Sequence, residues 1–275
     1  ASSSLNNRIV AETGKLDLNL SLFNLFGVKD VTVNVIPKTT VVPVGKAIGM
    51  KMYTEGVLVG MSEIEGQKPY EASGIEAGDK IIEVDNKQIS STDELIECVN
   101  NSNGNNVEIK YISEQEEKTT SIEPVKTSDN EYKLGLWVRD AAAGVGTLTF
   151  YEPSSGQFGA LGHGINDVDT YELIDIASGE LVTTDILEIV KGADGAPGEI
   201  RGSIDNGVTL GKISKNTSVG IYGNVENFAK VAQNNSKEME VANRSEIQTG
   251  KAEILCELEN GKTESYEIEI QKIFI

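Results

Sequence analysis

Short strand-like runs fill the second half of this chain almost to the exclusion of helical periodicity. The runs are LGLWVRD, GVGTLTFYE, ELIDIAS, DILEIVKG and VTLGKIS, and Gly, Asp, Asn and Ser separate them. Alternation of apolar and polar residues with period two puts the two kinds of side chain on opposite faces of a sheet. Asn260-Gly261, between two further alternating runs, predicts a hairpin. Residues 132–275 are therefore expected to form an all-β sandwich or barrel.

The charge balance excludes one large class of partners. The 275 residues hold 24 Lys and Arg against 43 Asp and Glu, which gives a formal net charge of −19. A field of that sign repels phosphate backbones, so nucleic-acid binding is not expected. The one histidine, His163, and the widely separated Cys98 and Cys256 do not make a zinc site, and neither a metal nor a cofactor is predicted. Each cysteine lies in an apolar segment and is interpreted as a buried free thiol, with a single disulfide as the alternative.

The first 39 residues predict one strand. Residues 28–36, VKDVTVNVI, alternate apolar and polar side chains and end at Pro37, as a half-buried strand does. Residues 1–7 are small and polar and are interpreted as a linker. No run approaches the ~18 apolar residues of a membrane-spanning helix, so any anchor is expected upstream of this sequence.

Residues 40–125 combine glycine turns, short strands and one capped helix. The stretch GKAIGMKMYTEGVLVGMSEI, from Gly45, is interpreted as two short strands joined by tight turns. Ser91 and Glu94 have the spacing of a capping box and predict a helix of about ten residues. This order resembles a bacterial PDZ domain. The residues that match its central signature are Gly74, Ile75, Gly78, Asp79 and Ile81.

The resemblance implies a peptide groove between the strand after Gly49 and the helix over residues 91–100. Backbone N–H groups at its start would receive a chain-terminal carboxylate, or an extended strand would add beside them. The candidate peptide-binding residues are Gly45, Ala47, Ile48, Gly49 and Met50. The alternative is that the glycines only make turns in a small α+β domain. Residues 113–131 are polar and acidic and are interpreted as a surface connection.

His163 is the candidate proton carrier. It lies in FGALGHGINDVDT between Gly162 and Gly164, and such small neighbours leave an imidazole accessible. Histidine is the side chain best suited to take and return a proton near neutral pH. Asp167 and Asp169 could orient the ring. From the residues alone, the alternative that His163 is an ordinary loop residue followed by an ordinary acidic turn stays open.

The succession of motifs resembles the stage IV sporulation protein B family. It runs from LGLWVRDAAAGVGTLTFYEP through FGALGHGINDVDT to GAPGE and GKISKNTSVGIYGNV. That family joins a membrane anchor, a PDZ domain and a serine peptidase domain. The resemblance implies a mainly β fold with a small α+β part, in which the PDZ domain precedes a β-barrel-like domain similar to part of a chymotrypsin-like double barrel.

The implied function is that of a PDZ-regulated serine endopeptidase of sporulation signalling. Such an enzyme acts outside the cytoplasm, between the forespore and mother-cell membranes. It cleaves a membrane-bound regulator and so triggers sigma-factor processing. Its partners would be that protein substrate and a peptide C-terminus or strand in the PDZ groove, and self-association stays open.

Within the resemblance, His163 is the catalytic histidine, but no serine can be named. The family's nucleophile lies in a GMSGSP-like motif, whereas Glu63 follows Gly60-Met61-Ser62, and Ser203 follows Arg201-Gly202. We therefore expect this 275-residue chain to be inactive and its peptidase domain to be incomplete at the C-terminus. The alternatives are a non-catalytic PDZ peptide-binding module or pseudopeptidase with a β scaffold domain, and a part of an envelope assembly.

Overall fold

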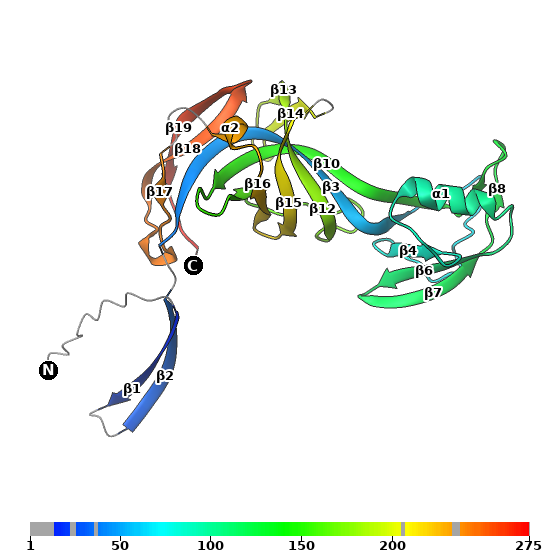
Figure 1. Ribbon diagram of the computed structural model, residues 1–275, viewed down its shortest axis with the longest axis horizontal. Coiled ribbons are helices and arrows are strands. Elements are labelled where there is room, and N and C mark those ends of the chain that lie inside the picture. The colour runs from blue at the N-terminus through cyan, green and yellow to red at the C-terminus, as the bar shows by residue number, and fades with distance from the viewer. Residues whose placement is uncertain (1–13, 23–25, 36–37, 205–206, 233–236, 275) are drawn as a thin grey trace.

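The computed structural model describes residues 14–22, 26–35, 38–204, 207–232 and 237–274 and consists mostly of β-strands. Strands account for 57% of the chain and helices for 7%. This confirms the predicted class, a mainly β protein with a small α+β part. Figure 1 shows an elongated molecule, with the hairpin β1–β2 at one end, a β-rich body in the middle and the part that contains helix α1 at the other end.

The elements follow in chain order as β1 (Gly14–Leu22), β2 (Phe26–Val35), β3 (Thr40–Met61), β4 (Lys80–Val84), β5 (Lys87–Gln88), α1 (Thr92–Asn101), β6 (Val107–Ser113), β7 (Glu116–Ile122), β8 (Val125–Lys126), β9 (Tyr132–Lys133), β10 (Leu136–Tyr151), β11 (Gln157–Ala160), β12 (Ile176–Thr183), β13 (Asp185–Val190), β14 (Glu199–Ser203), β15 (Thr209–Thr217), β16 (Gly220–Val225), α2 (Phe228–Val231), β17 (Met239–Glu240), a 3₁₀ turn (Arg244–Glu246), β18 (Gly250–Glu259) and β19 (Lys262–Ile270).

The middle body is a closed ring of paired strands. β3 pairs with β10 along one edge and with β12 along the other, and the neighbours β11, β16 and β15 complete the path between β10 and β12. Every pairing in this ring is antiparallel. The ring packs its inward side chains into one core, which includes Ile48, Met50, Leu148, Phe158 and Leu210. The expected relationship to a chymotrypsin-like double barrel stays a prediction.

A second core lies between α1 and the sheet strands β4, β6 and β7. Leu95 and Val99 are the buried residues of α1, and they pack with residues such as Ile81 and Ile109. Ser91 caps the helix, since its hydroxyl accepts a hydrogen bond from the N–H of Glu94 at 3.3 Å. The capped helix predicted from the Ser91 and Glu94 spacing is therefore confirmed.

The two cores share long strands, and the expected domain boundaries at residues 40 and 125 stay a prediction. β3 is one continuous strand, not two joined by tight turns, and it bends at Gly56, where φ is +73°. Its residues Val42 to Met52 pack into the core of the ring, whereas Val57 and Val59 pack into the core beside α1. Leu134, beyond the expected end of the PDZ domain, also packs beside α1. Two long strands, β3 and β10, therefore run through both bodies.

Two further expectations are corrected. The segment 113–131, interpreted as a connection, contains the strand β7, which pairs with β6 over its whole length. An edge strand with polar side chains on its exposed face has the composition of a loop. At the N-terminus the predicted strand is present as β2, but β1 precedes it and pairs with it, so the segment has two strands. The linker prediction for residues 1–7 lies outside the described residues.

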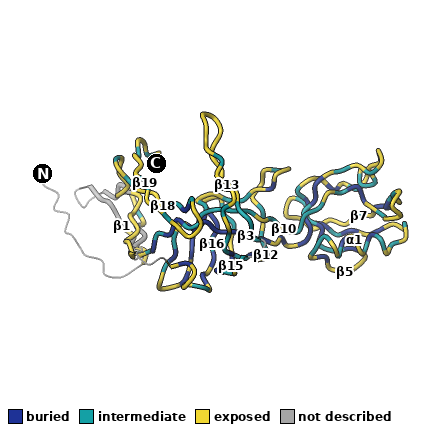
Figure 2. The backbone as a smooth tube through the Cα atoms, turned by 90° about the horizontal axis from the view of Figure 1, so that it is seen from above, coloured by how far each residue is buried: buried dark blue, intermediate teal, exposed yellow. Residues whose placement is uncertain are grey.

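The last hairpin, β18–β19, confirms the prediction from Asn260-Gly261. The turn places Gly261 at φ +76°, where glycine is favoured, and Glu259 pairs with Lys262. The hairpin is fastened to β3 through the buried carboxylate of Glu257, which accepts a hydrogen bond from the N–H of Ala47 at 2.9 Å. Figure 2 shows that the β13 hairpin projects from the body and is largely exposed.

Candidate active site and peptide groove

The turn after β11 presents His163 to solvent. Leu161 leads into the turn with a left-handed backbone, at φ +69°, and Gly162 follows at φ +82°. The N–H of Leu161 donates to the carbonyl of Thr147 at 3.0 Å, which ties the turn to β10. A left-handed leucine is uncommon and persists only where its surroundings hold it. The strained residue therefore marks a place where the fold fixes the position of His163.

Leu161 is held because its side chain enters a notch at Gly146. A Cβ atom added to Gly146 would lie 2.1 Å from Leu161 Cδ2 and 3.0 Å from Met50 Cε, so the space that a side chain would take is already filled. Gly144, two residues earlier on the same strand, has nothing within 4 Å of such an atom. The absence of a side chain at Gly146 thus makes room for Leu161, which in turn sets the start of the histidine turn.

His163 lines a cleft of about 750 Å³ between β10 and the segment that contains β14. The walls are apolar or small, and the lining residues include Val145, Leu161, Ile200 and Ile204. Two charged residues, Glu199 and Arg201, also line the cleft. Among the described residues, β10 pairs with β11 only from Leu148 onward, so the stretch before it has no partner strand on the edge opposite β3.

The hydrogen bonding of the His163 ring selects one tautomer. Nδ1 lies 2.9 Å from the carbonyl oxygen of Gly164, and because a carbonyl oxygen only accepts, Nδ1 carries the proton. In the neutral ring Nε2 then has the free lone pair and can accept a proton. The contact of this ring that the structure shows is the one with Gly164. The arrangement supplies a general base and leaves its nucleophile unassigned.

Asp167 and Asp169 do not orient the imidazole. Both bind Arg139 of β10, with Nη1 of the guanidinium 2.7 Å from Asp167 Oδ2 and Nη2 on Asp169 Oδ2. Asp167 is buried, and burial alone would raise its pKa. The N–H groups of Thr170 and Asp169, together with the Arg139 charge, outweigh burial and hold the pKa of Asp167 below its ordinary value. The acidic turn is therefore a binding site for Arg139.

The five residues that were predicted to bind a peptide belong to β3. These residues lie in the ring, where Gly49 and Met50 pair with β10 on one edge and with β12 on the other. Ala47, Ile48 and Met50 are buried. A peptide strand needs a free edge with exposed N–H and C=O groups, and both edges are occupied from Ile48 to Met50. These pairings give no support to strand addition at Gly49 and Met50, and peptide binding by Gly45, Ala47, Ile48, Gly49 and Met50 stays a prediction.

The structure places a groove elsewhere, between α1 and the start of β10. It has a volume of about 640 Å³, with Leu95, Ile96 and Val99 of α1 on one side. Leu134, Gly135, Leu136 and Val138 line the other side. On the edge opposite β3, this part of β10 has no partner strand among the described residues.

Sequence reasoning missed this groove because it did not place LGLWVRD beside the helix predicted over residues 91–100. The available signal was the order Leu134-Gly135-Leu136, a turn in which Gly135 has φ +79°, directly before an alternating strand. Such a turn can present backbone N–H groups to a carboxylate.

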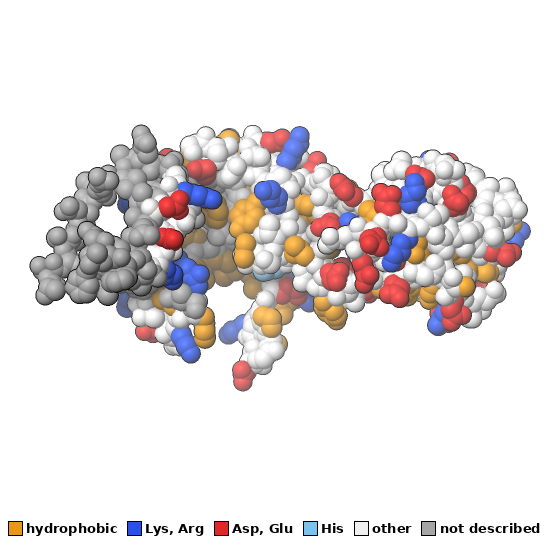
Figure 3. Space-filling model, turned by 90° about the horizontal axis from the view of Figure 1, so that it is seen from below, with side chains coloured by type: hydrophobic (Ala, Val, Ile, Leu, Met, Phe, Trp, Pro, Cys, Tyr) orange, Lys and Arg blue, Asp and Glu red, His pale blue; other side chains and the backbone are white. Residues whose placement is uncertain are grey.

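Acidic side chains dominate the charged surface. Figure 3 shows them gathered on one face near the junction of the middle body and the end body. Among the described residues, no group of three or more His, Cys, Asp or Glu side chains could hold a metal ion, and no helix is long and apolar enough to cross a membrane. Cys98 and Cys256 are free and half-buried, and burial, with a smaller effect of Glu257, raises the pKa of the Cys256 thiol.

Comparisons with known proteins match two family models to this chain. Residues 47–123 match the family model of the PDZ domain. Residues 130–275, more than half of the chain, match the family model described as SpoIVB peptidase S55. No curated protein matches the chain. The chain therefore belongs to the SpoIVB peptidase S55 family, a family of serine peptidases, and it carries a PDZ domain.

Proposed function

We propose that this protein is a PDZ-regulated serine endopeptidase of sporulation signalling, with His163 as its general base. The observation that carries the proposal is the exposed imidazole at the cleft between β10 and β14, with Nδ1 donating to Gly164. Nε2 takes the proton of a serine hydroxyl as its oxygen bonds to the substrate carbonyl carbon. It returns that proton to the leaving amine nitrogen when the peptide C–N bond breaks.

The cleft fits an extended polypeptide. Its β10 wall offers an unpaired strand edge before Thr147, to which a substrate strand could bind through backbone hydrogen bonds. The walls are formed largely by glycine and apolar side chains, such as Val145 and Ile200. They would accept small or apolar substrate residues close to the cleavage point. A membrane-bound regulator, cleaved between the forespore and mother-cell membranes to trigger sigma-factor processing, is the substrate that the family resemblance suggests.

We propose that the 275-residue chain holds no working nucleophile. The support is the sequence around Ser62 and Ser203, neither of which matches the GMSGSP-like motif that the family resemblance implies for the nucleophile. A fluorophosphonate probe, which labels serines activated by a neighbouring base, should therefore not label this chain. It should label a form of the protein that carries a serine in a GMSGSP-like motif, and His163→Ala should remove that label. Labelling of Ser62 or Ser203 in the 275-residue chain would contradict the proposal.

The PDZ groove is proposed to bind a peptide C-terminus or an extended strand. Its rim carries Glu63, Glu65, Asp129 and Glu131 against Lys133, so the charges favour peptides with basic residues. Titration of ¹⁵N-labelled protein with paired acidic and basic peptides, each as the free acid and as the amide, tests this. Amide shifts at Leu136 and Val138 should be larger for basic peptides. Equal responses to acidic and basic peptides would refute the role of the rim.

The second candidate is a non-catalytic PDZ peptide-binding protein. Its specific support is that the carboxylates of Asp167 and Asp169 bind Arg139. The acidic turn nearest to His163 therefore does not orient the imidazole, as the acidic member of a triad would. This candidate predicts peptide binding in the groove and no fluorophosphonate label on any form of the protein, whereas the peptidase proposal predicts a label that depends on His163.

A further inference from the structure

Arg139 connects the strand that bounds the peptide groove with the loop that carries His163. It lies on β10, next to Val138, which lines the groove. Its guanidinium binds two carboxylates of the loop over residues 161–175: Nη1 is 2.7 Å from Asp167 Oδ2, and Nη2 binds Asp169. A guanidinium presents its donors in a fixed planar fork, so contact with two carboxylates restricts the loop in orientation as well as in distance.

Asp167 turns this ion pair into a constraint on the backbone. It is 6% exposed, and while one oxygen binds Arg139, the other accepts hydrogen bonds from the N–H groups of Asp169 and Thr170, each at 3.0 Å. The side chain therefore fixes the turn that follows His163. If Arg139 were lost, Asp167 would keep a buried charge without its cation, which is costly.

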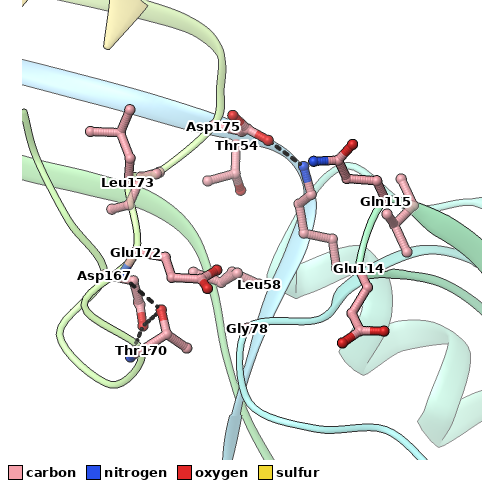
Figure 4. A pocket seen from close by; sticks show the side chains of 13 residues that line it. Thr54, Leu58, Gly78, Glu114, Gln115, Asp167, Thr170, Glu172, Leu173 and Asp175 are labelled. Atoms are coloured by element: carbon pink, nitrogen blue, oxygen red, sulfur yellow. Dashed lines mark hydrogen bonds and ion pairs between the residues drawn. The ribbon is translucent and has the colours of Figure 1, made fainter. Parts of the chain in front are cut away.

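The far side of the same loop touches the PDZ part of the molecule. A Cβ atom on Gly78 would lie 2.9 Å from Thr170 Cγ2, so the two residues are in close contact, and Lys80 binds Asp175 at 3.1 Å. Figure 4 shows Asp167 and Thr170 on one side of the intervening cavity and Asp175 across it. The cavity has a volume of about 430 Å³. The His163 loop is thus held against both bodies of the protein.

The residue after Arg139 fixes the other wall of the groove. Asp140 Oδ2 accepts a hydrogen bond from the N–H of Thr92, the first residue of α1, at 2.8 Å. The pairing of β10 with β3 shifts register between Arg139 and Ala141. Two adjacent residues at this irregularity therefore bind the groove helix and the histidine loop.

We propose that Arg139 is a positioning residue for His163, which fixes the histidine loop from the strand that forms the groove wall. The inference rests on the proposed function, because a position for His163 matters only if its imidazole acts on a substrate. A peptide strand added to β10 would pair next to Arg139 and could change the position of the His163 loop through it. No contact between a PDZ ligand and the cleft is needed.

The test uses the 275-residue chain and its single histidine. ¹³C-labelled histidine gives one imidazole signal, which reports His163 alone. Amide hydrogen exchange over residues 165–174 reports the loop. We compare the parent with Arg139→Gln, Arg139→Lys and Asp167→Asn, and with Arg244→Gln as the control for loss of one cationic side chain on the surface. Exchange of the PDZ amides in β4 and β6 shows whether each variant is folded.

Arg139→Gln should shift or split the His163 signal and should speed loop exchange by at least about tenfold, because a hydrogen bond to a charged group is ordinarily worth more than a tenfold change. Arg139→Lys should give an intermediate response, since an ammonium lacks the fork that reaches two carboxylates. In Arg139→Gln combined with Asp167→Asn, the two effects should not add.

An unchanged His163 signal with folded PDZ amides would overturn the proposal. Equal responses to Arg139→Gln and Arg244→Gln would overturn it too. If Arg139→Gln failed to fold and lost exchange protection throughout, Arg139→Lys and Asp167→Asn would still test the proposal. These two variants preserve the strand and change only the ion pair. If the Arg139 and Asp167 variants respond as predicted but no form of the protein reacts with the fluorophosphonate probe, the peptidase proposal is refuted. The role of Arg139 in fixing the loop then still stands.

Discussion

Replacement of Gly146 by alanine should displace the histidine turn, because Leu161 already fills the space that the new methyl group would take. The added Cβ would lie 2.1 Å from Leu161 Cδ2 and 3.0 Å from Met50 Cε. Both are ends of flexible side chains, so the neighbours can give way and the variant should still fold. Overpacking of this kind ordinarily costs about 1–3 kcal/mol. Leu161 should move because its left-handed backbone persists only while the notch holds its side chain.

Gly144→Ala is the matched control. Gly144 lies on the same strand two residues away and has nothing within 4 Å of an added Cβ. Its backbone, like that of Gly146, is outside the positive-φ region. Replacement of an unstrained glycine by alanine stabilises a protein by about 0.4–1 kcal/mol, because the unfolded chain has fewer conformations to lose. Gly146→Ala should therefore lower the free energy of unfolding, and Gly144→Ala should raise it.

The assay combines urea unfolding with the imidazole signal of His163. Gly146→Ala should lower the unfolding midpoint of the ring and shift the His163 signal, and Gly144→Ala should raise the midpoint slightly with no such shift. The two bodies can unfold separately, so the unfolding signal is taken from amides of the ring, such as those of β15. Equal stability of the two variants with an unmoved His163 signal would refute the account of the notch.

Three other perturbations test separate parts of the account. The depressed pKa of Asp167 gives stability that is present above the ordinary aspartate pKa and is lost as pH falls through the folded value. Exchange protection of the histidine loop should therefore hold from neutral pH to about pH 4 and fall only below it. Loss of protection between pH 7 and 5 would contradict a lowered pKa of Asp167. Ser91→Ala should cost about 1 kcal/mol through the lost cap, with the exposed Ser121→Ala as control in thermal unfolding. Leu134→Ala should destabilise the PDZ core by about 2–5 kcal/mol, whereas the exposed Leu187→Ala should stay within about 0.5 kcal/mol in urea titrations.

Local sequence patterns predicted the elements whose physical causes are local. Ser91 and Glu94 specify a helix start within four residues, and Asn260-Gly261 specifies a hairpin turn within two. The glycine-rich surroundings of His163 indicated an accessible imidazole for the same reason. What the glycines of the turn cannot reveal is that Leu161 takes the strained position and that Gly146, 15 residues earlier, makes room for it.

The failures come from pairings between distant segments. Alternation identified the strand through Ile48 and Met50, but whether its edges are free depends on β10 and β12, which lie far along the chain. The groove strand was missed for the same reason, since Leu136 is brought beside α1 by its pairing with Met61. Polar composition was likewise taken for a connection at β7, where an edge strand exposes one face.

The acidic turn gives the clearest case of a choice that composition cannot make. Asp167 and Asp169 follow His163 closely, and a role in orienting the ring was as open as an ordinary turn. The choice was made by Arg139, 28 residues before Asp167, which β10 places beside both carboxylates. An arginine that satisfies two carboxylates leaves the histidine to be oriented by its own turn, through Gly164.

The central claim is that His163 acts as the general base of a serine endopeptidase, and cleavage kinetics test it most directly. A form of the protein that carries a serine in a GMSGSP-like motif is compared with its His163→Ala variant on a fluorescent unfolded protein, and circular dichroism confirms that both are folded. Loss of a triad member removes several orders of magnitude in rate, so kcat/KM should fall at least about a thousandfold. Cleavage by the variant within about tenfold of the parent, about 1.4 kcal/mol of barrier, would contradict the claim.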